Sequence, residues 1–404
     1  MKKVIIIGGG PTGLFCAYKL LNSGIAVDLY DQMSGVGKKF LVAGHGGLNL
    51  THSESPEKFV SRYQENSEKF TGFLKSFTPE NLRSWCDEIG VETFVGSSGR
   101  VFPKKMKAGE MLNLWKDKLK SFSNFCFYPN HKLLKFEDNK VYFIKDGEQE
   151  VIKDYKYLVI ALGGASWKKT GSDGLWFEQL QKQGVLLSDF RPMNCGFEVD
   201  WSDKFIKDDE VFPIKNIEIS FKENKTKSEL MVTSYGVEGG GIYALSSFIE
   251  NEIYNQACCK ISIDLIPQKS EEEVKKILAT KDNKMTWSNF LRKKLKVSKE
   301  KYRLLKEVTS RLSKEEFINN LHFHLKHAYV DLSKCRPIDE AISTKGGVKF
   351  NCLSKHLSWL ENDKIYFGGE MLDWSAPTGG YLLQGCFSTA NIIAEDIIKR
   401  CELE

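Results

Sequence analysis

The sequence lacks the cysteine spacings and the long apolar runs that mark several classes of protein. Its 404 residues include 10 cysteines, but they form no Cys-x-x-Cys pair and no cysteine–histidine cluster with zinc-site spacing. Scattered cysteines in so long a chain do not suit the disulfide framework of a small secreted domain. No apolar run approaches the roughly 20 residues that cross a bilayer, and no secretory leader pattern opens the chain. We therefore expect reduced thiols, no metal site, no membrane association and a cytoplasmic protein.

The chain also lacks a strong excess of charge of one sign. The formal net charge is +5, and 41% hydrophobic with 27% charged residues is an ordinary globular composition, which argues against disorder, collagen and coiled coil. The positive charge is local, because residues 271–330 hold 12 Lys and 3 Arg against 8 acidic residues. This surplus indicates either a solvated helical surface, the commoner case, or a patch for an anionic partner.

The N-terminal segment carries a glycine-rich turn between two strand patterns. The continuous apolar run Val4–Ile7 is typical of a strand that is buried on both faces. It leads directly into Gly8–Gly13, and the residues that follow have the apolar spacing of a helix. After Gly24, a second strand pattern ends at Asp31. Strand, glycines, helix, second strand and terminal acid together form the fingerprint of a dinucleotide-binding unit.

Each residue type in this fingerprint has a physical role. Gly8 permits the tight turn, Gly10 lets the backbone approach a pyrophosphate, and Gly13 allows close packing of helix on strand. The helix N-terminus supplies free N–H groups and a positive dipole end for the phosphates. Asp31 is placed to accept hydrogen bonds from ribose hydroxyls. The predicted contacts in this segment are Gly8, Gly10, Pro11, Thr12, Gly13, Asp31 and Gln32.

The position of the fingerprint favours FAD over a nicotinamide dinucleotide as the bound cofactor. In two-domain flavoenzymes the FAD-binding unit commonly opens the chain, and no second G-x-G-x-x-G stands in a strand–helix context here. A nicotinamide cofactor therefore has no Rossmann domain of its own. We expect NAD(P)H, if it is used, to reach the flavin transiently as a reductant.

Two later strand patterns also end in glycines, as expected for strands whose ends approach a cofactor. The first ends at Gly163 and Gly164, and the second, Ile365–Glu370, is followed by Asp373. A helical pattern over Leu382–Ile398 comes next. Its N-terminus offers a dipole end that stabilises negative charge on a reduced flavin. The cofactor domain is thus predicted to be discontinuous, with an N-terminal and a C-terminal portion.

Longer segments carry a resemblance to a known family. GRVFP, GGxSxxKTGSDG and GEMLDxxxPTGGY are far more specific than G-x-G-x-x-G. With these segments the chain resembles the BaiN-like (YhiN-like) family of bacterial NAD(P)/FAD-dependent flavoproteins over nearly its whole length. Further matching segments are KKVIIIGGGPTGLFCAYKL, GVGKKFLVAGHGGLNLTHSE, ELMVTSYGVEGGGIYALS and DEAISTKGGVKF.

The resemblance implies FAD, and it implies site residues outside the N-terminal fingerprint. In the family a second glycine-rich loop lies near the flavin, and strand-end glycines and a C-terminal loop complete the site. Leu133, after a strand predicted at Asn124–Tyr128, would offer backbone bonds to adenine. The residues carried over are Lys38, Lys39, Gly46, Asn49, Thr51, Leu133, Gly163, Gly164, Asp373, Gly379, Gly380 and Tyr381.

The second glycine-rich loop departs from the family pattern. Many members read Gly-Gly-Gly-Arg-Cys-Asn there, whereas Gly44–Asn49 reads Gly-His-Gly-Gly-Leu-Asn. The missing Arg and Cys predict a distinct subgroup, and they leave the family's substrates open for this chain. His45, between two glycines, is our catalytic candidate as a proton shuttle, with a loop residue that bonds a carboxylate as the alternative.

Two further residues have a functional and a structural interpretation. Arg100 either binds an anionic substrate group or a nucleotide phosphate, or forms a salt bridge within the fold. Cys386, near the start of the C-terminal helix, is either a reactive thiol whose pKa the helix dipole lowers or, as is commoner, a small packing residue.

The predicted fold class is α/β, with a glutathione-reductase-like Rossmann domain for FAD that is interrupted by an insert. The FAD-binding domain is expected over 1–194 and 337–404, a β-barrel-like antiparallel domain over 195–268, and a basic helical subdomain over 269–336. Short strands are predicted at 196–200, 214–222, 229–234 and 260–265. Helices are predicted at 271–278, 286–295, 299–312 and 315–324.

These features predict an FAD-dependent oxidoreductase that moves hydride through a non-covalently bound flavin. The resemblance favours a small-molecule substrate with an activated double bond and NAD(P)H as the transient donor. One alternative is a flavin-dependent enzyme that modifies tRNA, motivated by the basic segment 271–330. That segment has many acidic residues and lacks aromatic interleaving, so no nucleic-acid partner is expected. A non-catalytic FAD-binding protein is the other alternative, and the oligomeric state stays open.

Overall fold

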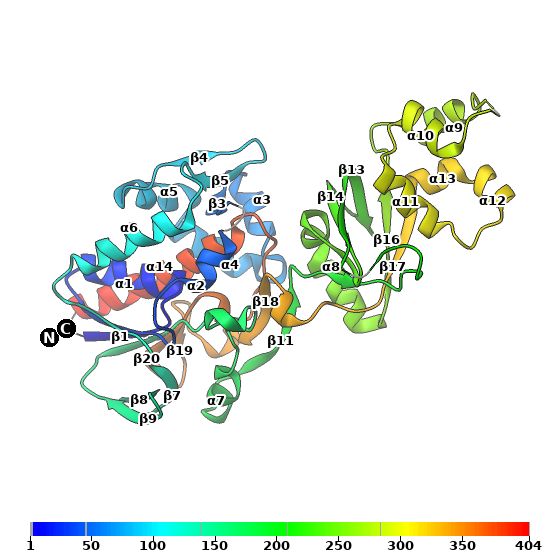
Figure 1. The fold of residues 1–404 in the computed structure, drawn as a ribbon. Coiled ribbons are helices and arrows are strands. Elements are labelled where there is room, and N and C mark those ends of the chain that lie inside the picture. The colour runs from blue at the N-terminus through cyan, green and yellow to red at the C-terminus, as the bar shows by residue number, and fades with distance from the viewer. Residues whose placement is uncertain (1–2, 45–46, 138, 208, 283, 404) are drawn as a thin grey trace. The chain divides into compact units, whose positions relative to one another are not determined.

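The computed structural model describes residues 3–44, 47–137, 139–207, 209–282 and 284–403. The chain forms two compact units (Figure 1). Unit 1 contains Met1–Arg191 and Ile338–Glu404, and unit 2 contains Pro192–Pro337. Unit 2 is therefore one continuous segment inserted between the two portions of unit 1.

A six-stranded sheet is the centre of unit 1, in the order β19-β20-β10-β1-β2-β6. Its strands are β1 (Lys3–Ile7), β2 (Ala26–Tyr30), β6 (Phe125–Tyr128), β10 (Tyr157–Ile160), β19 (Ser358–Trp359) and β20 (Asn362–Phe367). Five of these strands run parallel, and β19 pairs antiparallel with β20 at one edge. Because β20 comes from the C-terminal portion, the sheet joins both portions of unit 1. The carboxyl ends of the parallel strands meet at one edge, where ligands bind in open α/β sheets.

A layer of helices packs around α1, the helix that follows β1, and around α14 near the C-terminus. The helices of this layer are α1 (Pro11–Asn22), α4 (Ser67–Ser76), α5 (Pro79–Glu88), α6 (Ala108–Lys120) and α14 (Tyr381–Glu402). Phe15 of α1 lies edge-on to Trp85 of α5 and Phe387 of α14, with ring centroids 5.1 Å apart in both pairs. Such pairs contribute about 0.5–1.5 kcal/mol each beyond the area that they bury. They hold the N-terminal and C-terminal helices of unit 1 together.

Smaller sheets and short helices complete unit 1. One sheet has β3 (Thr51–His52), β4 (Thr93–Val95) and β5 (Arg100–Pro103); a second has β7 (Lys132–Glu137), β8 (Lys140–Lys145) and β9 (Glu148–Ile152); a third has β11 (Leu187–Met193) and β18 (Ser343–Val348). The short helices are α2 (Lys38–Ala43), α3 (Pro56–Ser61) and α7 (Trp176–Lys182). Short 3-10 turns cover Gln64–Asn66, Lys168–Thr170, Ile338–Glu340, Phe350–Cys352 and Gly369–Met371.

Unit 2 is built on a six-stranded antiparallel sheet in the order β12-β15-β14-β13-β16-β17. Its strands are β12 (Phe197–Glu198), β13 (Val211–Phe221), β14 (Asn224–Thr233), β15 (Gly236–Glu238), β16 (Cys259–Asp264) and β17 (Ala328–Leu332). The first strand, β12, also bonds the segment after the last one, since Glu198 N donates to Lys334 O at 2.8 Å. The β12 edge of the sheet is therefore hydrogen-bonded to the segment that follows β17 at the other edge.

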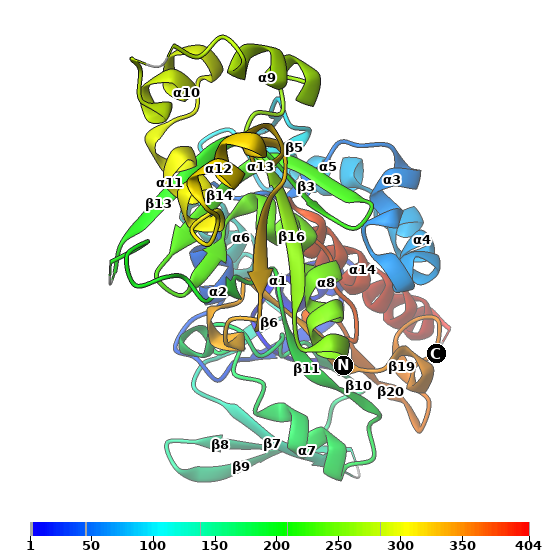
Figure 2. The ribbon, with the colours of Figure 1, turned by 90° about the vertical axis from the view of Figure 1, so that its right-hand side faces the viewer.

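Unit 2 also contains helices, and the first of them packs on this sheet (Figure 2). They are α8 (Gly240–Gln256), α9 (Glu271–Leu278), α10 (Trp287–Leu295), α11 (Lys299–Val308), α12 (Lys314–Asn319) and α13 (Leu321–Lys326). The helix α8 packs on strands β13–β16 and is absent from the sequence prediction. The predicted helix 315–324 is in fact two, because the backbone leaves helical geometry at Asn320.

The predicted fold class is confirmed: unit 1 is a Rossmann-type α/β domain, interrupted by an insert of antiparallel strands and helices. Within the part of the chain that the structure describes, no helix has the length and apolar character to span a membrane.

Candidate functional site

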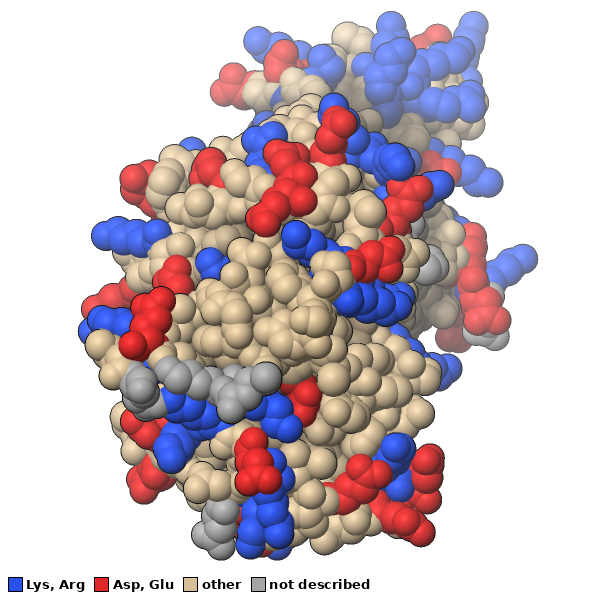
Figure 3. All heavy atoms as spheres, turned by 90° about the vertical axis from the view of Figure 1, so that its left-hand side faces the viewer, with Lys and Arg blue, Asp and Glu red and all other residues tan. Residues whose placement is uncertain are grey.

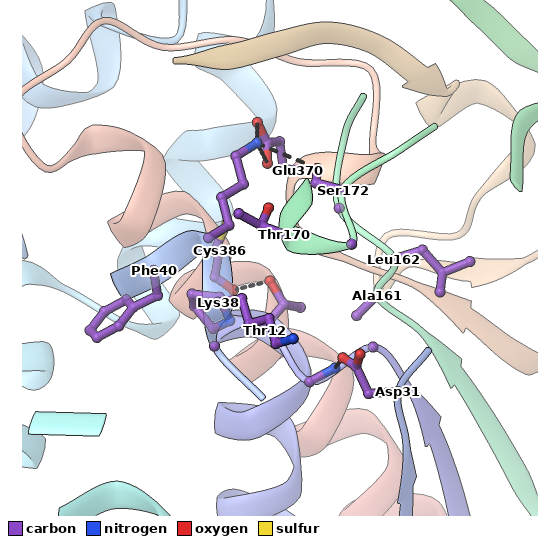
Figure 4. Close-up of a pocket in the computed structure, with 18 of the residues that line it drawn as sticks. Thr12, Asp31, Lys38, Phe40, Ala161, Leu162, Thr170, Ser172, Glu370 and Cys386 are labelled. Atoms are coloured by element: carbon purple, nitrogen blue, oxygen red, sulfur yellow. Dashed lines mark hydrogen bonds and ion pairs between the residues drawn. The ribbon is translucent and has the colours of Figure 1, made fainter. Parts of the chain in front are cut away.

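A pocket lies at the carboxyl edge of the central sheet of unit 1 (Figure 4). Glycine-rich turns after β1, β10 and β20 form its floor, Asp31 and Gln32 enter from the end of β2, and Cys386 enters from α14. The loop before α2 and the turn at Lys168–Thr170 supply further walls. The parts that the sequence predicts to bind a dinucleotide therefore meet at the crevice where such sheets bind ligands.

Three glycines of the first turn have distinct structural roles. Gly8 has φ +108°, and a Cβ on it would lie 2.2 Å from the carbonyl oxygen of Ala161. A Cβ on Gly13 would lie 1.9 Å from the carbonyl oxygen of Gly8. Gly10 differs, because it lines the pocket and a Cβ there would meet no atom of the described chain within 4 Å. Gly8 and Gly13 thus serve the packing of the chain on itself, whereas Gly10 leaves space for a ligand close to the backbone.

The start of α1 makes this side of the pocket electropositive. Gly10 is the N-cap and makes no side-chain capping bond, Pro11 stands in the first turn, and that turn has no acidic residue. The first N–H groups of a helix have no partner within it, and the helix dipole adds about half a positive charge there. Lys38 lines the same pocket. This arrangement suits the pyrophosphate of a dinucleotide.

Asp31 is held by two backbone N–H groups at the end of β2. Its Oδ2 accepts from Gly9 N at 2.6 Å and its Oδ1 from Met33 N at 2.7 Å. Burial raises the pKa of this carboxyl, although the two N–H groups and Lys38 oppose the rise. Each carboxylate oxygen accepts one bond and keeps a second lone-pair site, so both can still accept from hydroxyl groups. The geometry is compatible with the predicted role at a ribose.

Lys39 forms a largely buried ion pair in the wall of the pocket. Its Nζ lies 2.8 Å from Glu370 Oε2 and donates to Ser166 Oγ at 2.8 Å. The side chains of Lys39 and Glu370 are 24% and 15% exposed. The pair joins α2 to the turn after β20. Sequence reasoning did not assign Glu370 to the site, although the glycines that precede it had marked the end of that strand.

A second group of predicted residues gathers at the start of α14. Gly379 and Gly380 have φ of +120° and +102°, and a Cβ on Gly380 would lie 2.6 Å from the Cα of Thr51. The hydroxyl of Thr51 and the side-chain oxygen of Asn49 are buried and have no hydrogen-bond partner in the described structure. Buried polar atoms without a partner are uncommon in folded proteins. A bound group with hydrogen-bonding atoms would satisfy them, so these orphaned atoms fit a cofactor that contacts this loop.

Tyr381, the first residue of α14, is fixed by a polar network and by stacking. Its hydroxyl donates to Glu54 Oε1 at 2.7 Å, and Arg62 donates to both oxygens of Glu54, at 3.0 and 2.8 Å. Its ring stacks on His52 with the centroids 5.4 Å apart. Burial and the bond to Glu54 raise the pKa of Tyr381. The hydroxyl therefore stays protonated and donating at neutral pH.

Three more predicted residues lie in or behind the wall of the pocket. Gly163 lines it, with φ +72°. Gln32 also lines it, but its Nε2 donates to Gly171 O at 2.6 Å and so fastens the loop after β10. Gly164 is packed against the interior instead, because a Cβ on it would lie 2.6 Å from Thr344 Oγ1.

The structure does not bring the other predicted residues to this pocket. Leu133 is buried in β7 and does not line the pocket. Asp373 does not line the pocket either, and its Oδ2 accepts from Ser188 Oγ at 2.6 Å. The catalytic candidate His45 and the neighbouring Gly46 lie outside the described residues.

Cys386 lines the pocket as a buried thiol. Burial raises the pKa of Cys386 to about 12, so the thiol stays protonated. The backbone of the same residue links two helices, because Thr12 Oγ1 donates to the Cys386 carbonyl oxygen at 3.3 Å (Figure 4). These observations favour the packing interpretation of Cys386 over the reactive one.

Comparison with known proteins gives the family. The family described as "HI0933-like protein Rossmann domain" matches residues 2–396. The chain belongs to the HI0933-like family. This match and the relatives below confirm the resemblance to BaiN-like and YhiN-like flavoproteins.

Two relatives share the full length of this HI0933-like protein. It is 25% identical over 413 residues to the "Ribosomal RNA dihydrouridine synthase" of Haemophilus influenzae, covering 98% of both chains. It is 23% identical over 420 residues to the "3-dehydro-bile acid delta(4,6)-reductase" of Clostridium scindens, covering 99% of this chain and 100% of that one. Among solved structures, the 3-ketosteroid delta1-dehydrogenase of Sterolibacterium denitrificans aligns with 99% of this chain and 100% of its own, with a TM-score of 0.53 and 8% identity. That last likeness concerns the fold alone.

The family and the pocket agree on the cofactor. The HI0933-like protein is an FAD-dependent oxidoreductase, as the sequence predicts. The open space at Gly10, the unneutralised start of α1 and the orphaned oxygens of Asn49 and Thr51 all fit a bound dinucleotide. Among the described residues, no three His, Cys, Asp or Glu side chains gather in an arrangement that could hold a metal ion.

Proposed function

We propose that the HI0933-like protein reduces a carbon–carbon double bond that is conjugated to a carbonyl group. Its two full-length relatives support this, because both names describe such a reduction: a dihydrouridine synthase saturates a uracil ring, and a delta(4,6)-reductase saturates bonds of a bile acid ketone. The proposed donor is NAD(P)H, visiting transiently, since the sequence has no second dinucleotide fingerprint.

The pocket at the sheet edge is the observation that carries the proposal. Bound there, FAD supplies the redox-active ring. The chain would hold the phosphates at the start of α1 beside Gly10, and a ribose at Asp31. The start of α14, a helix of 22 residues, offers a second positive dipole end at Gly380 and Tyr381. Fixed donors of this kind stabilise negative charge without reorganising when the charge develops.

Anaerobic spectroscopy of the purified protein tests the proposal. We expect a yellow protein whose flavin band is bleached by NADH or NADPH and restored by 2-cyclohexen-1-one. Cyclohexanone, which lacks the double bond, is the matched acceptor and should restore nothing. The proposed reaction is wrong if two results are found together. In the first, no conjugated alkene, uridine included, reoxidises the reduced flavin; in the second, a saturated ketone or alcohol changes the redox state of the flavin.

A second candidate is that the double bond belongs to a uracil ring within RNA. One observation favours it: residues 284–299 carry no acidic residue and six cations, and the five within 292–299 are exposed. Figure 3 shows Lys and Arg side chains gathered at the top of the view, over this helical part of unit 2. The six are Lys284, Arg292, Lys293, Lys294, Lys296 and Lys299. None of them forms an ion pair within the described structure, so their charge is free to meet phosphates.

RNA binding at two salt concentrations tests this candidate. In a gel shift with a ribosomal RNA fragment, the double variant K293E/K294E should bind at least 10-fold more weakly than the unsubstituted protein. The matched control is K225E/K227E, which reverses two exposed charges on β14. Affinity that is insensitive to salt, or equal losses in both variants, would remove the RNA candidate.

A further inference from the structure

An arginine without a partner stands next to the start of α14. Arg100 is the first residue of β5, and in the β3–β5 ladder it lies directly opposite His52. Residues that are directly opposite in an antiparallel pair present their side chains on the same face of the sheet. The contacts of the Arg100 and His52 side chains therefore show which part of the chain packs against that face.

This face of the β3–β5 ladder meets the turn at Gly379–Tyr381. The His52 ring stacks on the Tyr381 ring, at 5.4 Å between centroids. Arg100 Nε lies 3.5 Å from the point that a Cβ on Gly379 would occupy. Tyr381 Cε2 lies 3.3 Å from the same point, so the Arg100 side chain and the Tyr381 ring both approach the backbone of Gly379.

The side chain of Arg100 differs from those of three other arginines of unit 1, which each have a partner. Arg62 pairs with Glu54 at 2.8 Å, Arg400 pairs with Asp363 at 2.8 Å, and Arg83 donates to Thr93 Oγ1 at 3.0 Å. The side chain of Arg100 is exposed and forms no hydrogen bond or ion pair with any described residue. The salt bridge that the sequence offered as an alternative for Arg100 is therefore not formed within the described structure.

Among the described residues, the carboxylate of the neighbouring network does not neutralise this position. Glu54, the acid of the neighbouring network, already accepts from Arg62 and from the Tyr381 hydroxyl. The first turn of α14 has no acidic residue. The His52 ring is held by two hydrogen bonds, since its Nδ1 accepts from Glu54 N at 3.1 Å and its Nε2 bonds Ser98 O at 3.0 Å.

A guanidinium without a partner therefore lies beside the positive end of a long helix, whose first turn holds no acidic residue. Two positive groups that lie close together repel each other unless an anion binds between them. Both of these groups bind oxyanions, because the helix end offers backbone N–H groups and the guanidinium offers two parallel N–H donors. The buried hydroxyl of Thr51, beside Gly380, adds an unsatisfied polar atom to the same loop.

We propose that Arg100 binds an oxyanionic group of the substrate, a carboxylate or a phosphate, and so determines which conjugated alkenes the site accepts. The proposal rests on the proposed function only in taking the ligand to be the substrate of the flavin site. If a carboxylate probe binds, the substrate is a small carboxylic acid. If a phosphate probe binds, the substrate is a nucleotide.

Binding to the FAD-loaded protein, measured by calorimetry, tests this proposal without turnover. The probes are two pairs that differ in one charge: 1-cyclohexenecarboxylate with its amide, and uridine 5′-monophosphate with uridine. We expect at least one anion to bind 10-fold or more tightly than its neutral partner. Arg100→Met should abolish that preference by weakening the anion alone, and Arg100→Lys should retain part of it.

The matched control removes a different exposed cation close to the same strand. Lys104 follows β5 and pairs with Glu92 at the surface, where both side chains are largely exposed. Lys104→Met should leave all four dissociation constants, the flavin spectrum and the melting temperature as they were.

Three results would overturn the role of Arg100. They are anion binding by Arg100→Met at the original strength, equal losses in Lys104→Met, or no binding of either anion at millimolar concentration. Failure of the proposed function has a different signature, because a flavin that no alkene reoxidises would still leave the anion preference measurable.

Discussion

At the scale of single residues, Gly10 and Gly13 belong to one turn but constrain the protein in different ways. A Cβ on Gly13 would collide with the Gly8 carbonyl oxygen at 1.9 Å, so the contact between helix and strand depends on that glycine. A Cβ on Gly10 would meet no described atom and would point into space that belongs to the pocket. Folding and cofactor binding can therefore be separated by substitution within four residues.

The two glycines should respond differently to substitution. Gly10→Val should weaken FAD binding at least 10-fold and leave the melting temperature of the apoprotein unchanged. Gly13→Ala should lower the stability of the apoprotein itself by about 1–3 kcal/mol, the usual cost of overpacking a tight contact. Flavin fluorescence titration and thermal unfolding of the apoprotein measure the two effects. Equal loss of stability in both variants would contradict the separation.

Residue pairing over long distances was not predictable from the sequence. The glycine roles are local, since Gly8 and Gly13 are five residues apart and their contact follows from one turn. Lys39, in contrast, is neutralised by Glu370, 331 positions away. Nothing in the local sequence of either residue indicates the other, because the pair forms only when β20 takes its place beside β10.

At the scale of elements, helices were predicted from the sequence where capping residues mark their ends. The helix α9 has the predicted bounds, because Ser270 and Glu273 form a capping box in which each side chain accepts from the other's backbone N–H. The helix α8 was missed because it begins in glycines, which are poor helix formers. Gly241 is needed there, since a Cβ on it would lie 2.9 Å from the backbone carbonyl oxygen of Glu229 on β14.

The capping box of α9 yields a local stability prediction. Ser270→Ala removes the side chain that accepts from Glu273 N, which costs about 1 kcal/mol of helix stability. Hydrogen exchange of the amides in Glu271–Leu278 should therefore become roughly 5-fold faster. Ser288→Ala, an exposed substitution inside α10, is the control and should leave α9 unchanged. Unchanged exchange in Ser270→Ala would show that tertiary packing alone holds α9.

At the scale of the whole molecule, the chain divides its tasks between two units. Every residue that lines the cofactor pocket belongs to unit 1, although those residues come from both portions of the chain. Unit 2 has its own buried apolar residues and its own antiparallel sheet. FAD should therefore stabilise unit 1 and leave the stability of unit 2 unchanged.

Calorimetry of the apoprotein and the FAD-loaded protein tests this division. Free FAD at 100 times its dissociation constant should stabilise unit 1 by about 2.7 kcal/mol, because it binds the folded form alone. The transition of unit 2 should keep its midpoint. In a variant that keeps only Trp201 or Trp287, both in unit 2, tryptophan fluorescence identifies the unfolding transition of that unit. An equal shift of both midpoints would show that the units unfold together.

The sequence by itself determined the features that depend on neighbours along the chain: the glycine fingerprint, the helix caps, the FAD-binding class and the basic stretch within 271–330. These follow from backbone sterics and hydrogen bonds that span a few residues. The tertiary structure alone decided which charges are neutralised. Lys39 is paired and Arg100 is left free beside Gly379, because charge balance depends on groups that folding brings together from distant parts of the chain.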